Sequence, residues 1–223
     1  MLKAILSLIY KDFTLTRGHG LIQALLMGLL LLFVFSLSQE MGSTMPAQGA
    51  ATIFWLATAF CQVLVFNTLY SIEEVNNARQ GLLLMPQPLY VIWLSKAVTG
   101  VILIIIAQAV FLPAAIVFLG QNFSPFWWKA LGAIVIVDLG MAASGSLLGA
   151  LSQGQAAKES LLSIILFPLI IPLLLAGIRL LTAGFSTEIS EDMSTWFGIA
   201  LAFDALFLGA GLLLFDYMYT GED

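Results

Sequence analysis

The sequence predicts an all-α polytopic membrane protein whose six transmembrane helices form a single domain over residues 1–223. Its residues are 61% hydrophobic and only 9% charged, and the mean hydropathy is +1.03. Soluble domains carry about 25% charged residues. Six separate apolar runs are each long enough to cross a bilayer, which takes about 20 residues of helix. We therefore expect spans at 21–37, 50–70, 97–119, 127–151, 160–181 and 196–217.

The segment 1–17, before the first span, predicts an amphipathic helix that lies at the cytoplasmic membrane interface. Apolar side chains recur every three or four residues and so share one helical face, while charged residues occupy the other. The apolar run from Leu21 is too long for the hydrophobic part of a signal peptide, so no cleaved leader is expected. The apolar residues are Leu2, Ile5, Leu6, Leu8, Ile9 and Phe13, and the charged ones are Lys3, Lys11, Asp12 and Arg17.

The positions of the basic residues predict that both ends of the chain face the cytoplasm. Lysine and arginine accumulate in the cytoplasmic loops of membrane proteins. With the N-terminus inside, only Lys129 and Arg179 fall near the outer ends of spans, and the first outer loop, 38–49, has neither residue type. The other basic residues then lie inside: Lys3, Lys11, Arg17, Arg79, Lys96 and Lys158.

The polar stretch 70–96 interrupts the apolar runs between the second and third spans. It holds Glu73, Glu74 and Arg79 in a chain that is otherwise poor in charge. A polar insert of this size must lie outside the bilayer, and the predicted topology places it in the cytoplasm. We interpret it as the segment that a soluble partner contacts; a solvated charged face without a partner is the alternative.

Among the charged residues within predicted spans, we single out Asp138, Arg179 and Asp204. Charged groups inside a membrane are costly and usually pair with one another or line a functional path. One interpretation is a structural ion pair. The other is a polar lining for a ligand path, or a contact with another membrane subunit.

Two further patterns concern packing in the fourth and fifth spans. Small residues four positions apart let helix backbones approach closely, either within one chain or across a dimer seam. Prolines inside a helix remove a backbone donor and bend it. The small residues are Gly140 with Ser144 and Gly145 with Gly149, and the prolines are Pro168 and Pro172.

Catalytic motifs are absent from the sequence. There is no phosphate-binding loop of the GxxxxGK[ST] type, and no HExxH, GxSxG or CxxC pattern. With His19 and Cys61 as its only histidine and cysteine, the chain has no set of metal ligands, and Cys61 is expected to be a buried thiol. We predict no enzyme activity, no metal and no nucleic-acid partner, so energy must come from a partner or an ion gradient.

Three stretches together resemble a known family. They are KDFTLTRGHG at 11–20, IFWLATAFCQVLVFNTLYSIEEVNNARQGLLLMPQPLYVIWLSK at 53–96 and SLLSIILFPLIIPLLL at 160–175. Their order and spacing are similar to the heme exporter protein B (cytochrome c maturation protein B) family. Its members are membrane subunits of the ABC-2 class of ABC transporters. The likeness covers most of residues 1–180.

The resemblance implies a permease subunit in the bacterial cytoplasmic (inner) membrane, surrounded by lipid. Its partners would be a cytoplasmic ABC ATPase that binds ATP, a second six-span subunit (a copy or a different protein), other cytochrome c maturation membrane proteins and a heme chaperone. Heme would be the transported or handled ligand rather than a bound cofactor. Segment 70–96 would be the coupling element, with contact residues Glu73, Glu74, Asn77, Arg79, Gln80, Leu83 and Pro86.

The sequence departs from the family pattern within this coupling element. Asn77 and Gln80 stand where family members usually carry Gly and Glu. Asn tolerates the left-handed backbone that Gly would supply, but the missing Glu removes a charge that could pair with the partner.

Other functions stay open from the sequence alone. An ABC-2 exporter subunit for a lipid, a polysaccharide or a drug would share the same spans and loop. An ion-coupled carrier or a passive assembly scaffold would depend on Asp138 instead, and would leave the cytoplasmic loop without a clear role.

Overall fold

In the computed structural model, eight helices make up the described part of the chain, which contains no strand. Six of these helices are long and apolar enough to cross a membrane, as predicted, and the other two are α1 and α4. The described residues are 2–38, 45–75, 78–122, 124–125, 127–152, 158–186 and 193–220. The helices are α1 (Leu2–Thr16), α2 (His19–Leu37), α3 (Ala47–Val75), α4 (Ala78–Leu83), α5 (Tyr90–Phe118), α6 (Trp127–Leu151), α7 (Lys158–Phe185) and α8 (Met193–Thr220).

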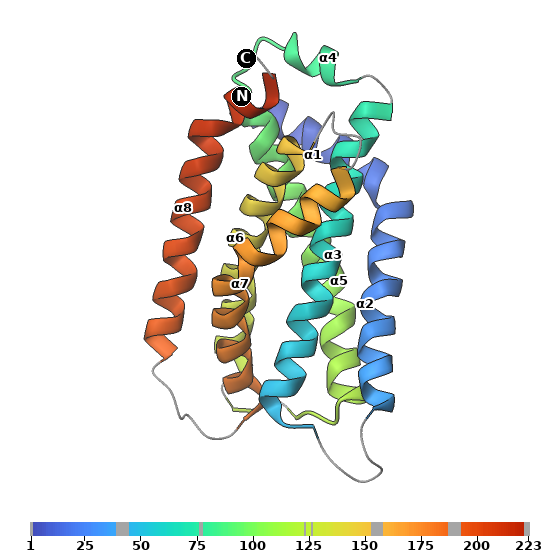
Figure 1. Cartoon of the computed structure of the whole chain (residues 1–223), viewed down its shortest axis with the longest axis vertical. Coiled ribbons are helices and arrows are strands. Elements are labelled where there is room, and N and C mark those ends of the chain that lie inside the picture. Colours follow the sequence, from blue (N-terminus) through green and yellow to red (C-terminus); the bar gives the residue numbers. More distant parts are fainter. Residues whose placement is uncertain are drawn as a thin grey trace.

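The six long helices run side by side along the long axis of the molecule (Figure 1). The start of α1, the end of α8 and the short helix α4 all lie at one end, which an even number of spans produces. α1 packs against α5 and α3 at that end. The C-terminal ends of α2, α5 and α7 and the N-terminal ends of α3, α6 and α8 lie at the opposite end.

Helices α3 and α5 extend further toward each other than the apolar runs predicted. α3 continues to Val75 and α5 begins at Tyr90, whereas the expected spans ended at 70 and began at 97. The polar residues that bounded the prediction, among them Glu73 and Lys96, are buried and paired. Their charges therefore do not end the helices.

Helix α6 is at the centre of the packing and contacts α3, α5, α7 and α8. In the apolar windows of α3 and α6, 72% of the residues are buried, against 22% in α8. The small residues of α6 make this possible: a Cβ at Gly145 would lie 2.5 Å from the Phe66 ring, and one at Gly149 would lie 2.6 Å from the Tyr70 ring. Both glycines therefore serve packing within the chain, one of the two predicted roles.

Helix α7 stays continuous from Lys158 to Phe185 with Pro168 and Pro172 inside it. Figure 1 shows it changing direction near its middle, where the two prolines lie. This is the bend that the prolines predict, because each removes a backbone hydrogen bond and crowds the preceding turn.

The close approach of α3 to α6 gives a first testable prediction. Gly145→Ala should lower the free energy of unfolding by about 1–3 kcal/mol, because the added methyl overlaps the Phe66 ring. The control is Gly209→Ala in α8, where nothing lies within 4 Å of the added Cβ. It should be neutral, or stabilising by up to about 1 kcal/mol. Thermal unfolding of both purified variants in detergent measures the difference, and equal stabilities would contradict the packing.

Candidate functional site

The polar stretch between α3 and α5 contains a short helix, α4. α4 packs against α3, and its last turn is completed by hydrogen bonds from Leu84 N to Gln80 O (3.3 Å) and from Met85 N to Leu82 O (3.2 Å). Leu82 is buried, whereas the Leu84 side chain is 85% exposed. The prolines at 86 and 88 then prevent the helix from continuing. The result is a compact projection at the end of the molecule, with an apolar side chain at its tip.

Four charged residues lie at the base of this projection, and we refer to Lys11, Asp12, Glu73 and Lys96 as the charge cluster. Lys96 Nζ lies 2.9 Å from Glu73 Oε1, and Lys11 Nζ lies 3.0 Å from the same oxygen. Lys11 Nζ is also 3.0 Å from Asp12 Oδ1, and Lys96 Nζ is 3.7 Å from Asp12 Oδ2. Two cations thus face two carboxylates, so the charges balance where water is largely excluded.

The burial of the cluster makes this balance essential. The Lys96 side chain is fully buried and that of Glu73 is 2% exposed. A buried charge is tolerated when close ion pairs and hydrogen bonds replace its water. Lys96 meets this condition: it also donates a hydrogen bond to Leu69 O (2.9 Å), and its Nζ lies 4.7 Å from the centre of the Tyr70 ring.

Hydrogen bonds extend the network from the cluster to α6. The Tyr70 hydroxyl lies 2.9 Å from Ser146 Oγ, and Ser146 Oγ donates to Trp93 O at 3.2 Å. Since the Ser146 proton is used on Trp93, Tyr70 is the donor in its bond to Ser146. Residues of α1, α3, α5 and α6 are therefore connected around the base of α4.

Lys11 is the member of the cluster closest to solvent, with 35% of its side chain exposed. Burial acts to lower the pKa of Lys11, but the carboxylates of Asp12 and Glu73 act to raise it, and the net effect is an increase above the usual value. A raised lysine pKa stabilises the fold below the unfolded-state value, and this contribution is lost as pH rises through the folded-state value. The Lys11 contacts are thus fully formed at neutral pH.

The structure places the seven predicted coupling residues in different surroundings. Glu73 points into the charge cluster, so its side chain is not available to a partner in this conformation. Its partners Lys11, Asp12 and Lys96 could not be recognised from the sequence, because they lie on α1 and α5. Gln80 and Pro86 are exposed, Glu74 and Leu83 are half-buried, and Asn77 and the side chain of Arg79 lie outside the described residues.

Among the described residues, neither intramembrane carboxyl forms an ion pair with Arg179, so the structure does not show the first of the two interpretations. Asp138 Oδ1 accepts a hydrogen bond from Gln108 Nε2 at 2.8 Å. Asp204 approaches α6 from its other side, at Gly140, where an added Cβ would overlap the carboxylate. The Arg179 guanidinium lies 5.8 Å from the Trp196 ring centre. α6 itself separates the two carboxyls.

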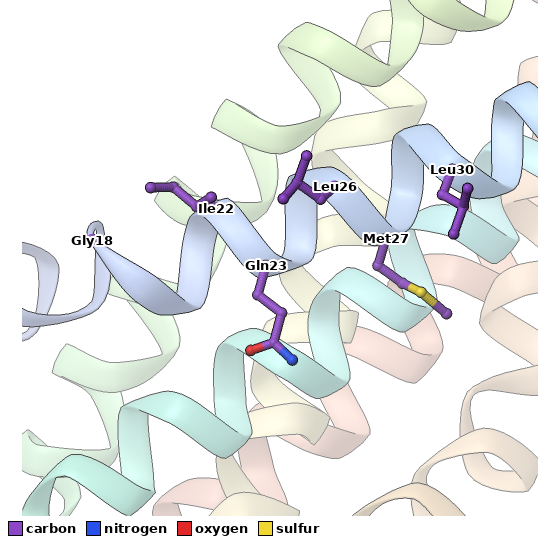
Figure 2. Close-up of a pocket in the computed structure, with 6 residues that line it drawn as sticks. All are labelled: Gly18, Ile22, Gln23, Leu26, Met27 and Leu30. Atoms are coloured by element: carbon purple, nitrogen blue, oxygen red, sulfur yellow. The ribbon is translucent and has the colours of Figure 1, made fainter.

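A groove on the surface of α2 is separate from these groups. Figure 2 shows Gln23 and Met27 on one side of the helix, with Ile22 and Leu26 on the other. Its remaining lining residues are Gly18 and Leu30. The groove shares no residue with the charge cluster and follows the apolar outer face of a span, which is the surface that faces lipid.

Comparison with known proteins identifies one family. A family model described as CcmB protein matches residues 3–213, nearly the whole chain. A search of curated proteins gave no match.

The charge cluster gives the second testable prediction. Lys96→Met leaves a buried excess of negative charge and should lower the free energy of unfolding by about 3–5 kcal/mol. Adding Glu73→Gln restores the charge balance with Lys11 and Asp12, so the double variant should recover part of the loss.

Chemical denaturation of the single and double variants in detergent measures this coupling. Losses that simply add would show that Lys96 and Glu73 do not depend on each other.

Proposed function

The chain belongs to the CcmB family, and we propose that it is the subunit that couples ATP hydrolysis by a separate cytoplasmic ATPase to transport. Membership makes it a multi-pass membrane component of the heme exporter for cytochrome c maturation. The ATP-driven step would export heme or release a heme-loaded chaperone. The chain would work in the bacterial inner membrane, with other maturation proteins and a second six-span subunit.

The observation that supports coupling is the ionic connection between the two helices that flank α4. α3 leads into α4 and α5 follows it, and the Glu73–Lys96 pair joins these two helices at 2.9 Å. A partner that displaces α4 therefore moves α3 and α5 together instead of bending one against the other. Lys11 adds α1 to the same unit through its contact with Glu73.

The surface offered to the ATPase lies on the exposed side of the projection. Gln80, Leu84 and Pro86 are exposed, and Leu84 is the most exposed large apolar side chain described at this end. Apolar side chains that enter a partner's pocket often dominate the binding energy. We therefore place the main contact at Leu84, one residue after the predicted Leu83, which is half-buried.

The third prediction tests this contact directly. Leu84→Asp should reduce co-purification of the ATPase about tenfold or more, because a charge replaces an apolar side chain in the contact and about 1.4 kcal/mol corresponds to a factor of ten. Leu84→Met is the matched control and should retain binding. Equal ATPase recovery with both variants, at equal membrane levels, would remove Leu84 from the interface.

Glu73→Lys is not a substitute for this experiment. It would place three lysines around Asp12 in a buried site, so a loss of ATPase would report damage to the fold. Leu84 avoids this problem because its side chain is 85% exposed.

The fourth prediction separates the two forms of the ATP-driven step. The test uses cells whose partner ATPase binds but cannot hydrolyse ATP. If the ATP-driven step is release of the heme-loaded chaperone, heme should still reach the chaperone, and the loaded chaperone should stay on the membrane. If the ATP-driven step is heme export by this complex, no loaded chaperone should form. Heme staining of chaperone in membrane and soluble fractions distinguishes the outcomes, with active ATPase as control.

A further inference from the structure

Asp138 lies near the middle of α6 and is fully buried. Its Oδ1 accepts a hydrogen bond from Gln108 Nε2 at 2.8 Å, whereas its Oδ2 has no hydrogen-bond partner. The same is true of Gln108: its amide nitrogen is bonded and its Oε1 is buried without a partner. Two adjacent polar groups therefore each leave one oxygen unsatisfied.

The groups that face Asp138 do not balance a negative charge. From α3, Thr58 is a neutral polar neighbour at 3.5 Å from Gln108 Nε2, and Cys61 is a buried thiol within electrostatic range of the carboxyl. α5 supplies Gln108. α7 and α8 pack on α6 as well, but Asp204 of α8 meets Gly140 on the other side of α6, and no cation of the described residues is paired with Asp138.

An ionised carboxylate in these surroundings would be isolated in an apolar interior, which is far more costly than burying a neutral, hydrogen-bonded acid. A single proton on Oδ2 corrects both defects. It removes the charge, and it turns Oδ2 into a donor that complements Gln108 Oε1, the unsatisfied acceptor of the same pair. A carboxylic acid and a primary amide each have one donor and one acceptor on the facing edge.

We propose that Asp138 is a membrane-embedded proton-binding site, with the proton held on Oδ2 and Gln108 as its paired amide. The ligand is a proton taken from water, and binding converts the carboxylate to the neutral acid without any redox change. The packing of α6 does not require this group to be an acid, because a neutral amide would fill the same space.

The position of the site gives the proton a consequence that rests on the proposed coupling function. Gln108 belongs to α5, which moves with α4, whereas Asp138 belongs to α6. Separation of α5 from α6 would remove the amide and admit water, and the acid would then release its proton. Proton binding itself does not depend on an ATPase, so its test and the coupling tests can fail independently.

The fifth prediction concerns the infrared spectrum of the chain in lipid bilayers. At neutral pH the spectrum should contain the C=O stretching band of a protonated carboxylic acid, shifted in heavy water. Asp138→Asn should remove a component of this band that the matched control Asp204→Asn retains. Three outcomes would each overturn the proposal. They are the absence of an acid band, a band that only Asp204→Asn removes, and a band that added sodium ions remove.

The stability of the same variants provides a second measurement. Asn is an isostere of the protonated acid and can pair with the Gln108 amide, but it cannot ionise in the unfolded state, so Asp138→Asn should be at least as stable as the parent at neutral pH. Because the native state holds the proton more tightly than the unfolded state, the parent should lose stability as pH rises, and Asp138→Asn should lose less. Cys61→Ser, introduced into both the parent and Asp138→Asn, removes the Cys61 thiol as a cause of the pH dependence. A variant clearly less stable at neutral pH would show that the carboxylate is the native form.

Discussion

The buried contact between Glu73 and Lys96 is the interaction on which the functional end of the molecule depends. It lets two helices carry charges into a region where water is excluded, so that α3 and α5 run on to the base of α4. If either charge were unpaired, its burial would cost several kcal/mol, and the helix would be driven to expose it. Lys11 and Asp12 extend the pair to α1 and keep the local charge balanced.

The cluster is also tied to the packing of α6, through Tyr70. The Tyr70 ring packs against Gly149, and the Lys96 ammonium lies 4.7 Å from the centre of the ring. The Tyr70 hydroxyl is hydrogen-bonded to Ser146. A larger residue at 149 would displace the ring and with it the cation and the hydrogen bond. The small residues of α6 and the charge cluster are therefore parts of one structural arrangement.

The sequence predicted the spans well because their apolar runs depend only on local composition. α6 has the predicted bounds, and the small residues and prolines took the predicted roles in packing and bending. It could not predict the pairings, because Lys11 and Glu73 are 62 positions apart and Gln108 and Asp138 are 30 apart. Topology rules assume that charged residues lie in contact with water. On this assumption Glu73 was assigned to a partner contact and Lys96 to a cytoplasmic loop. Depth along a span says nothing about which helical face a residue occupies, so the sequence could not decide whether Arg179 pairs with a carboxyl.

The two kinds of polar contact described here differ in strength, and their distribution indicates which helices move together. The ion pairs of the cluster connect α1, α3 and α5 only, and breaking one costs several kcal/mol. The contacts from this unit to α6 are hydrogen bonds: Gln62 to Met141 O, Tyr70 to Ser146, Ser146 to Trp93 O and Gln108 to Asp138. Neutral hydrogen bonds contribute about 0.5–1.5 kcal/mol each, and a protonated Asp138 makes all four neutral. The polar contacts across the boundary with α6 are then weaker than the ion pairs that join α1, α3 and α5, whereas an ionised Asp138 would strengthen its contact with Gln108. The proposed protonation of that single carboxyl would therefore weaken one of the polar contacts between α6 and the unit formed by α1, α3 and α5.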